Sequence, residues 1–225
     1  MRRELRALPR DLAERVGNHL AAAEMLVADD PALAYEHAQA AVRRGGRLAV
    51  VREICGVTAY AAGRWHDAAR ELRAARRLGT PTELLPLIAD CERGMGRPER
   101  ALTLAESTEA ARLDDTARIE MLIVAAGARR DMGQRDAAVV MLQVPELKAR
   151  TKAPWQVRLR YAYADALAAA GRQDEAASWF ERVAQQDNAG ETDAEDRWAD
   201  LTGQQRRSRR PAAPDDEGDG IIDLG

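Results

Sequence analysis

The chain has 225 residues, of which 46% are apolar but only 4% are aromatic. Alanine supplies much of the apolar content, and because alanine is the best helix former and a poor strand former, the composition argues against an all-β fold. The 34 basic and 37 acidic residues nearly cancel to a net charge of −3, which argues against a protein that acts as a polycation over its whole length. The two cysteines, Cys55 and Cys91, exclude a disulfide-dense scaffold and a multi-thiolate zinc site within the chain.

The N-terminal segment is charged throughout and lacks the apolar core of about 7–15 residues that a signal peptide needs. No apolar run approaches the roughly 18–20 residues that cross a bilayer. We therefore expect a cytoplasmic protein with no membrane partner. Residues 1–14 are predicted to be an N-terminal extension that leads into the first helix.

A repeated pattern follows over residues 15–187. Each copy has a helical run, a turn residue, a polar charged tetrad and, five positions after the turn residue, an alanine. The turn residues are Asp29, Gly63, Gly96, Gly133 and Gly171, with spacings of 34, 33, 37 and 38. The alanines five positions after the turn residues are Ala34, Ala68, Ala101, Ala138 and Ala176. The small residues seven positions before the turn residues are Ala22, Gly56, Ala89, Ala126 and Ala164.

Each copy predicts a helical hairpin. Glycine at the end of the first helix supplies a left-handed C-cap, and acidic residues in the tetrad favour the positive end of the second helix. Small residues let the two backbones approach closely. One hairpin cannot bury its own apolar faces, so its neighbours must stack on it. We place the helix pairs at 10–28 and 31–44, 48–61 and 65–78, 82–94 and 98–111, 115–132 and 135–144, and 153–170 and 173–186.

The pattern resembles the tetratricopeptide repeat (TPR) family, in which a small residue, a Gly or Asp turn and an A-x3-F motif recur about every 34 residues. The second copy matches with Gly56, Gly63, Ala68, Leu72 and Ala75, and the fifth matches with Gly171, Ala176, Phe180, Tyr161 and Tyr163. The second copy departs from the family pattern at two positions, where Arg52 stands in place of an early Trp and Ala59 in place of a Tyr. The resemblance implies an all-α, right-handed superhelical α-solenoid of about five hairpins.

A TPR-like solenoid implies a concave groove lined mainly by the first helices. Carrying over the family's groove positions gives His19, Glu53, Val57, Tyr60, Asp90, Arg93, Arg130, Arg158, Tyr161 and Asp165. The Lys, Asn and Arg clamp of chaperone-binding TPR proteins is missing, because its places hold residues such as His19, Ala23, Ile54, Glu83 and Leu87. A groove of mixed charge with two tyrosines suits a peptide or helix with both polar and apolar anchors.

Signatures of catalysis are missing from the sequence. There is no G-x-S-x-G elbow and no phosphate-binding loop, and His19, His37 and His66 have no metal-ligand spacing to one another or to a thiol. The stretch 215–223 resembles part of a calcium-binding loop but lacks its bidentate glutamate and flanking helices. We therefore expect no enzyme activity, no cofactor and no metal.

The character of the chain changes after Asp187. Residues 188–203 are predicted to form a capping segment, in which Trp198 and Leu201 pack on the last hairpin. Residues 204–225 are predicted to be a disordered tail, first basic and then acidic. Its basic run, Arg206 to Arg210, lacks interleaved aromatic residues and precedes five acidic ones, which argues against nucleic-acid binding. The acidic end, with Ile221, Ile222 and Leu224, is expected to dock on another protein or in the groove of its own chain.

The sequence thus favours a non-catalytic protein–protein interaction module, an adaptor, scaffold or assembly factor that binds a partner's peptide or helix in the concave groove. The alternative is a regulatory subunit that controls a partner enzyme or transcription factor through its convex surface or tail. The pattern does not predict the identity of the partner.

Overall fold

The computed structural model describes residues 2–79, 82–149, 151 and 153–203. Over these residues the chain is all-helical, which confirms the predicted fold class at that level. The helices are α1 (Arg2–Leu5), α2 (Arg10–Leu26), α3 (Pro31–Gly45), α4 (Ala49–Ala61), α5 (Trp65–Arg77), α6 (Leu85–Gly94), α7 (Pro98–Ala105), α8 (Asp115–Asp131), α9 (Arg135–Leu142), α10 (Trp155–Ala169), α11 (Gln173–Gln186) and α12 (Ala194–Thr202), with short 3-10 turns η1 (Thr82–Leu84), η2 (Ala110–Arg112) and η3 (Pro145–Lys148). The predicted tail, residues 204–225, lies outside the described residues.

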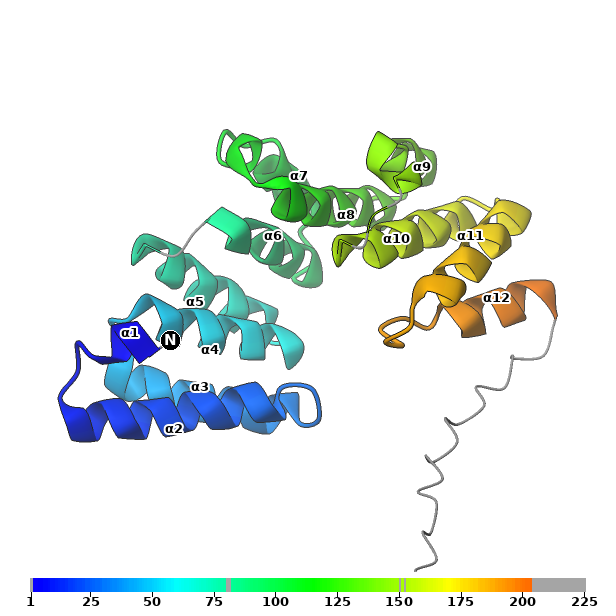
Figure 1. The fold of residues 1–225 in the computed structure, drawn as a ribbon. Helices are drawn as coiled ribbons and strands as arrows, with labels where there is room; N and C mark the ends of the chain where they lie inside the picture. The colour runs from blue at the N-terminus through cyan, green and yellow to red at the C-terminus, as the bar shows by residue number, and fades with distance from the viewer. Residues whose placement is uncertain (1, 80–81, 150, 152, 204–225) are drawn as a thin grey trace, which may run out of the picture.

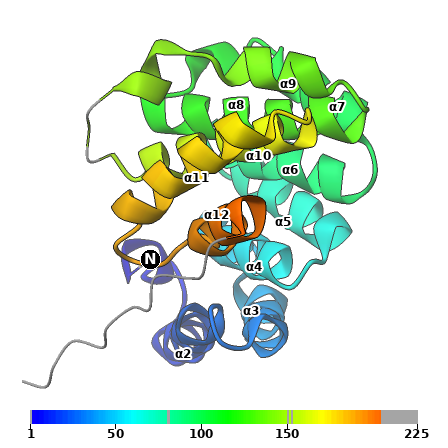
Figure 2. The same cartoon turned by 90° about the vertical axis from the view of Figure 1, so that its right-hand side faces the viewer.

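Helices α2 to α11 form five hairpins, in each of which a first helix contacts the second helix that follows it in the chain. The first helices are α2, α4, α6, α8 and α10, and the second helices are α3, α5, α7, α9 and α11. Each second helix also contacts the first helix of the next hairpin. The hairpins follow an arch from α2 to α12, with α7 and α9 on its outside (Figure 1). Figure 2 views the arch from the end at which α10, α11 and α12 lie.

Four hairpins turn at a glycine in the same way. Gly63, Gly96, Gly133 and Gly171 have φ between 69° and 80°, the left-handed region that favours glycine. At Gly63 the amide of the next residue, Arg64, donates to the Ala59 carbonyl over 2.8 Å, and the equivalent bond recurs in the other three turns at 2.9 to 3.0 Å. This is the Schellman arrangement, which satisfies carbonyls that the helix end leaves without a partner.

The first hairpin turns differently from the other four. Asp29 was expected at its turn position, but no described non-glycine residue has a positive φ. Instead, the side chain of Asp30 accepts a hydrogen bond from the Leu33 amide over 3.0 Å, and Pro31 follows at the first helical position. An aspartate N-cap followed by proline starts α3 efficiently, so no glycine is needed.

The prediction of a helix over 98–111 was wrong at its C-terminal end, because α7 stops at Ala105. The Ser107 hydroxyl donates to the Leu104 carbonyl over 2.7 Å and accepts from the Ala110 amide over 3.2 Å. These local bonds offer the backbone an alternative to the helix. The Asp114 side chain then caps α8 by accepting from the Ala117 amide.

The small residues of the repeat lie where the helices meet. The five alanines after the turns, Ala34, Ala68, Ala101, Ala138 and Ala176, are buried with at most 1% exposure. Gly56, Ala89, Ala126 and Ala164 are also buried, whereas Ala22 of the first copy is only half-buried. At Gly56 the approach is close, since an added Cβ would lie 2.6 Å from Leu72 Cγ of α5.

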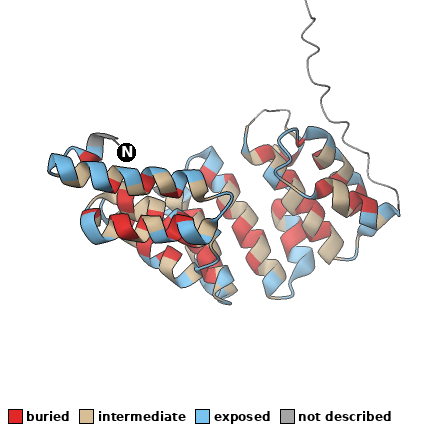
Figure 3. Cartoon of the chain, turned by 90° about the horizontal axis from the view of Figure 1, so that it is seen from below, coloured by how far each residue is buried: buried red, intermediate tan, exposed pale blue. Residues whose placement is uncertain are grey.

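The hydrophobic core is a row of four clusters along the arch rather than one centre, and buried residues recur in every hairpin (Figure 3). At the N-terminal end, Leu5 of α1 joins the cluster of Val16 and Leu20, and the Glu4 carboxylate accepts from the Val50 amide in the first turn of α4. At the other end, α12 packs on α11, with Trp198 in the same cluster as Phe180. Among the described residues, no helix has the length and apolar character needed to span a membrane.

Candidate partner-binding surface on the first helices

Six of the ten predicted groove residues lie on α6, α8 and α10, and most of them bind one another or a neighbouring helix. Tyr60 Oη of α4 donates to Asp90 Oδ2 of α6 over 2.5 Å. Arg93 Nη1 donates to the other oxygen of Asp90 over 2.5 Å, while its Nε donates to Asp131 of α8 over 2.8 Å. These bonds join three successive first helices.

A second set of bonds continues from α8 to α12. Arg130 of α8 pairs with Asp165 of α10, and Arg197 of α12 donates to the other oxygen of Asp165 over 3.0 Å. Tyr161 Oη of α10 donates to Asp193 Oδ1, before α12, over 2.5 Å. The Arg197 guanidinium also stacks on Phe180, 4.8 Å from the ring centre. We call the two sets together the first-helix ladder; its residues are Tyr60, Asp90, Arg93, Asp131, Arg130, Asp165, Arg197, Tyr161 and Asp193.

Burial and the bonds of the ladder shift the pKa values of three of its residues. Burial, together with the hydrogen bond to Asp90, raises the pKa of Tyr60 well above its ordinary value. Burial alone would lower the pKa of Arg93, but Asp131 and Asp90 outweigh it and raise that pKa. Burial and the neighbouring Arg93 charge lower the pKa of Arg130. The ladder is therefore a structural network in which most of the polar groups already have partners.

Beside the ladder is a cavity of about 560 Å³, which we call the first-helix hollow. Apolar and aromatic side chains from four first helices and η1 line it, together with a few charged groups, which is typical of a ligand site. Its described lining includes Tyr60, Glu83, Leu84, Pro86, Leu87, Asp90, Arg93, Glu120, Ile123, Trp155, Arg158 and Glu191. A smaller cavity of about 170 Å³, lined by Arg130, Tyr161 and Asp165, shares Arg93 with it.

The unpaired charge of the hollow is negative. Arg158 pairs with Glu120 over 2.7 Å, and Arg93 belongs to the ladder. Glu83, by contrast, is exposed and makes no hydrogen bond or ion pair with any residue that the structure describes. Burial, and then the Glu4 and Glu83 charges, raise the pKa of Glu53 on α4, and burial raises that of Glu120. A cationic group at this edge would relieve the repulsion among these carboxylates.

Of the predicted groove residues, His19, Glu53 and Val57 line neither the hollow nor the smaller cavity. His19 of α2 has its Nδ1 3.1 Å from Nδ1 of His37 on α3, and burial and His37 lower its pKa. Val57 is 38% exposed but does not line the hollow.

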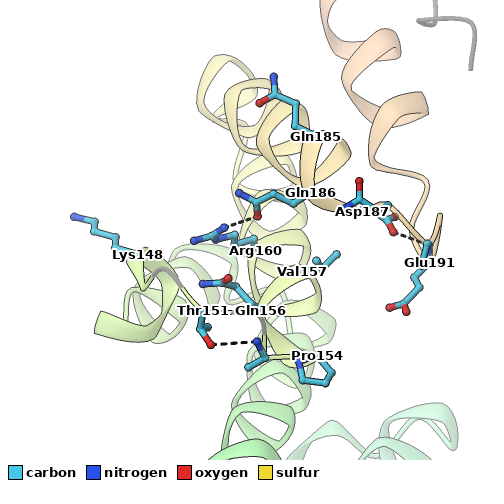
Figure 4. Close-up of a pocket in the computed structure, with 13 residues that line it drawn as sticks. Lys148, Thr151, Pro154, Gln156, Val157, Arg160, Gln185, Gln186, Asp187 and Glu191 are labelled. Atoms are coloured by element: carbon cyan, nitrogen blue, oxygen red, sulfur yellow. Dashed lines mark hydrogen bonds between the residues drawn. The ribbon is translucent and has the colours of Figure 1, made fainter.

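A larger cavity than the hollow, about 1010 Å³, lies elsewhere, between α10 and the end of α11 (Figure 4). Its buried Arg160 donates from Nε to the Leu147 carbonyl over 3.2 Å, from Nη2 to the Ala149 carbonyl over 2.8 Å, and from Nη1 to Gln186. Each guanidinium nitrogen thus has a protein partner, and the side chain fastens η3 to α10 and α11. The cavity is a packing feature and not the preferred site.

The sequence did not single out Trp155, Ile123 or Leu84 of the hollow. Trp155 starts α10 after Pro154, is partly buried, and packs against the C-terminal core cluster as well as lining the hollow. No group of three or more His, Cys, Asp or Glu residues in the described part of the chain is arranged to hold a metal ion. A scan against protein-family models and a search of curated proteins found no match.

Proposed function

We propose that the chain is a non-catalytic interaction module, a right-handed solenoid of five TPR-like hairpins that binds a peptide or helix of another protein in the first-helix hollow. The observation that supports this most strongly is the hollow itself. It combines two aromatic rings, Tyr60 and Trp155, with aliphatic walls and an unpaired carboxylate, Glu83. Buried aromatic anchors beside a few charged groups are the usual source of binding energy in such sites.

The ligand's chemistry follows from what the hollow leaves unpaired. The arginines that line it are engaged with Glu120 and with the ladder. Glu83 has no hydrogen-bond or ion-pair partner among the described residues, and the backbone amide of Glu191 donates to Asp187. We therefore infer a segment that places an apolar side chain against Trp155 and Leu87 and an arginine or lysine near Glu83. This is the helix-in-groove or peptide mode, in which apolar anchors supply affinity and charge supplies selectivity.

The test is selection from a displayed random-peptide library with the full chain as bait. Enriched peptides are expected to combine a large apolar residue with a basic one, and their affinity is expected to fall about tenfold in Trp155→Ala and in Glu83→Lys. Glu99→Lys on α7 makes the same charge reversal at an exposed site outside the hollow and serves as the control. Equal binding by all variants, or enrichment of acidic peptides at this site, contradicts the proposal.

The alternative, a regulatory subunit that acts through its other face or tail, has a separate observation in its favour. Second helices α5 and α7 border an arginine-rich cleft on a different part of the arch. A library selection in which binding survives every hollow variant but fails with changes on α5 and α7 would favour this alternative.

A further inference from the structure

A second cavity, of about 420 Å³, lies between α5, the end of α6 and the start of α7, and we call it the arginine cleft. Five arginines and one glutamate are in its lining: Arg70, Arg73, Arg77, Arg97, Arg100 and Glu92. The arginines come from α5, from the turn before α7 and from α7 itself, and Glu92 lies near the end of α6. The cleft shares no residue with the first-helix hollow.

The charges of the cleft do not cancel. Glu92 is almost fully buried and holds Arg73 at 2.5 Å and Arg97 at 3.7 Å. Arg70 pairs with Asp67 and with Glu71, and Glu71 is also held by Arg52. Arg77 and Arg100 are exposed and make no hydrogen bond or ion pair with any residue that the structure describes. The cleft thus presents a surplus of two guanidinium groups, with the half-exposed Arg73 and Arg97 beside them.

A surplus of exposed guanidinium groups selects carboxylates or phosphates, which arginine binds with paired hydrogen bonds. The apolar lining is Ala69 and Met95, and no Tyr, Trp or Phe is among the described lining residues. A nucleic-acid site would be expected to offer such rings for base stacking. The chemistry therefore favours an acidic peptide.

We propose that the arginine cleft binds the acidic stretch 215–223 of this same chain. That stretch has five carboxylates in nine residues, Asp215, Asp216, Glu217, Asp219 and Asp223, and no basic residue. Residues 204–214 join it to α12 and span up to roughly 40 Å when extended. The occupied cleft belongs either to the same chain or to a second copy, and the experiment below distinguishes the two. The proposal is independent of the proposed function, because the two sites share no lining residue.

Photo-crosslinking of the full chain tests the proposal, with a photoreactive phenylalanine analogue in place of Ile221. Proteolysis and mass spectrometry are expected to locate the crosslink on α5, the end of α6 or the start of α7. The product's size shows whether it joins one chain or two. In Arg77→Gln/Arg100→Gln its yield is expected to fall on the order of tenfold, the effect of losing two exposed ion pairs, and raised salt is expected to lower the yield of the parent.

Arg112→Gln/Arg135→Gln is the matched control, since both arginines are exposed, lie outside the cleft and give the same change in charge. Circular dichroism checks that each variant keeps its helices. Crosslinks that fall on α8 or α10 beside the first-helix hollow, the absence of any crosslink, or an equal loss of yield in both double variants would overturn the proposal.

Discussion

The guanidinium of Arg93 on α6 lies directly over Gly127 of α8, where an added Cβ would be 2.8 Å from Arg93 Cζ. Arg93 reaches Asp131 across this gap, so the glycine in the middle of α8 makes room for one bond of the first-helix ladder. A glycine inside a helix ordinarily costs about 1 kcal/mol relative to alanine. The cost here is offset by the contact that the missing side chain permits.

This relationship predicts an interaction between the two positions that a double-mutant cycle can measure. Gly127→Ala in the parent chain is expected to change the free energy of unfolding little, because the gain in helix propensity is offset by displacement of Arg93. In an Arg93→Ala background, the same change is expected to stabilise the chain by about 1 kcal/mol. Urea unfolding of the four proteins measures both values, and equal effects in the two backgrounds would show that Arg93 does not depend on the glycine.

Gly56→Ala is expected to destabilise the chain by about 1–3 kcal/mol, the usual cost of overpacking. The added methyl would lie 2.6 Å from Leu72 Cγ and 3.1 Å from the Leu72 amide nitrogen, so the α5 backbone has to move. Gly17→Ala is the control, because its Cβ would meet Leu5 at an ordinary 3.5 Å. Urea unfolding should show a loss only at Gly56, and a smaller one when Leu72 is also alanine; similar effects at both glycines would contradict the close approach.

Asp187 predicts a pH dependence of stability. Burial alone would raise the pKa of this carboxyl, but hydrogen bonds from Thr192 and from the Glu191 amide outweigh it and lower that pKa. Since the unfolded chain then binds more protons than the folded one, the stabilisation is present above the ordinary aspartate pKa of about 3.9 and is lost as pH falls through the lower folded value.

Asp187→Asn is accordingly expected to lower the free energy of unfolding by about 1–3 kcal/mol at pH 7, and by progressively less as the pH is lowered from 5 toward 3. Urea unfolding across this range measures the difference from the parent. Asp29→Asn, at an exposed position in the turn between α2 and α3, is the control. A difference that stays constant or grows at low pH would refute the assignment.

Cys55 and Cys91 are buried in one cluster, and burial raises the pKa of each thiol to about 12. At pH 8 a thiol reagent is therefore expected to modify neither residue until the chain opens, and labelling should accelerate with urea in step with unfolding. Ser178→Cys on the exposed surface of α11 provides a thiol that should react at once. Rapid labelling of the native parent would contradict the packing of this cluster.

Local features of the fold were predictable and long-range pairings were less so. The glycines at 63, 96, 133 and 171 predict left-handed turns because few other residues adopt that conformation. The early end of α7 was missed because it depends on the hydroxyl bonds of Ser107. For the first-helix ladder, the sequence shows which positions carry polar residues, but it does not show that Tyr60 binds Asp90 thirty positions later. The repeat did offer a signal for these pairings, because Tyr60, Arg93 and Arg130 occupy the same position in successive copies, three residues before the turn glycine.

The first-helix ladder has a mechanical consequence. Its bonds run between successive first helices, from Tyr60 on α4 to Arg197 on α12. None of these hydrogen bonds involves a second helix. Because these bonds lie along one side of the row of hairpins, they hold the first helices close to one another and leave the spacing of the second helices to apolar packing. We therefore expect the loss of one ladder bond to change the curvature of the row more than its helix content.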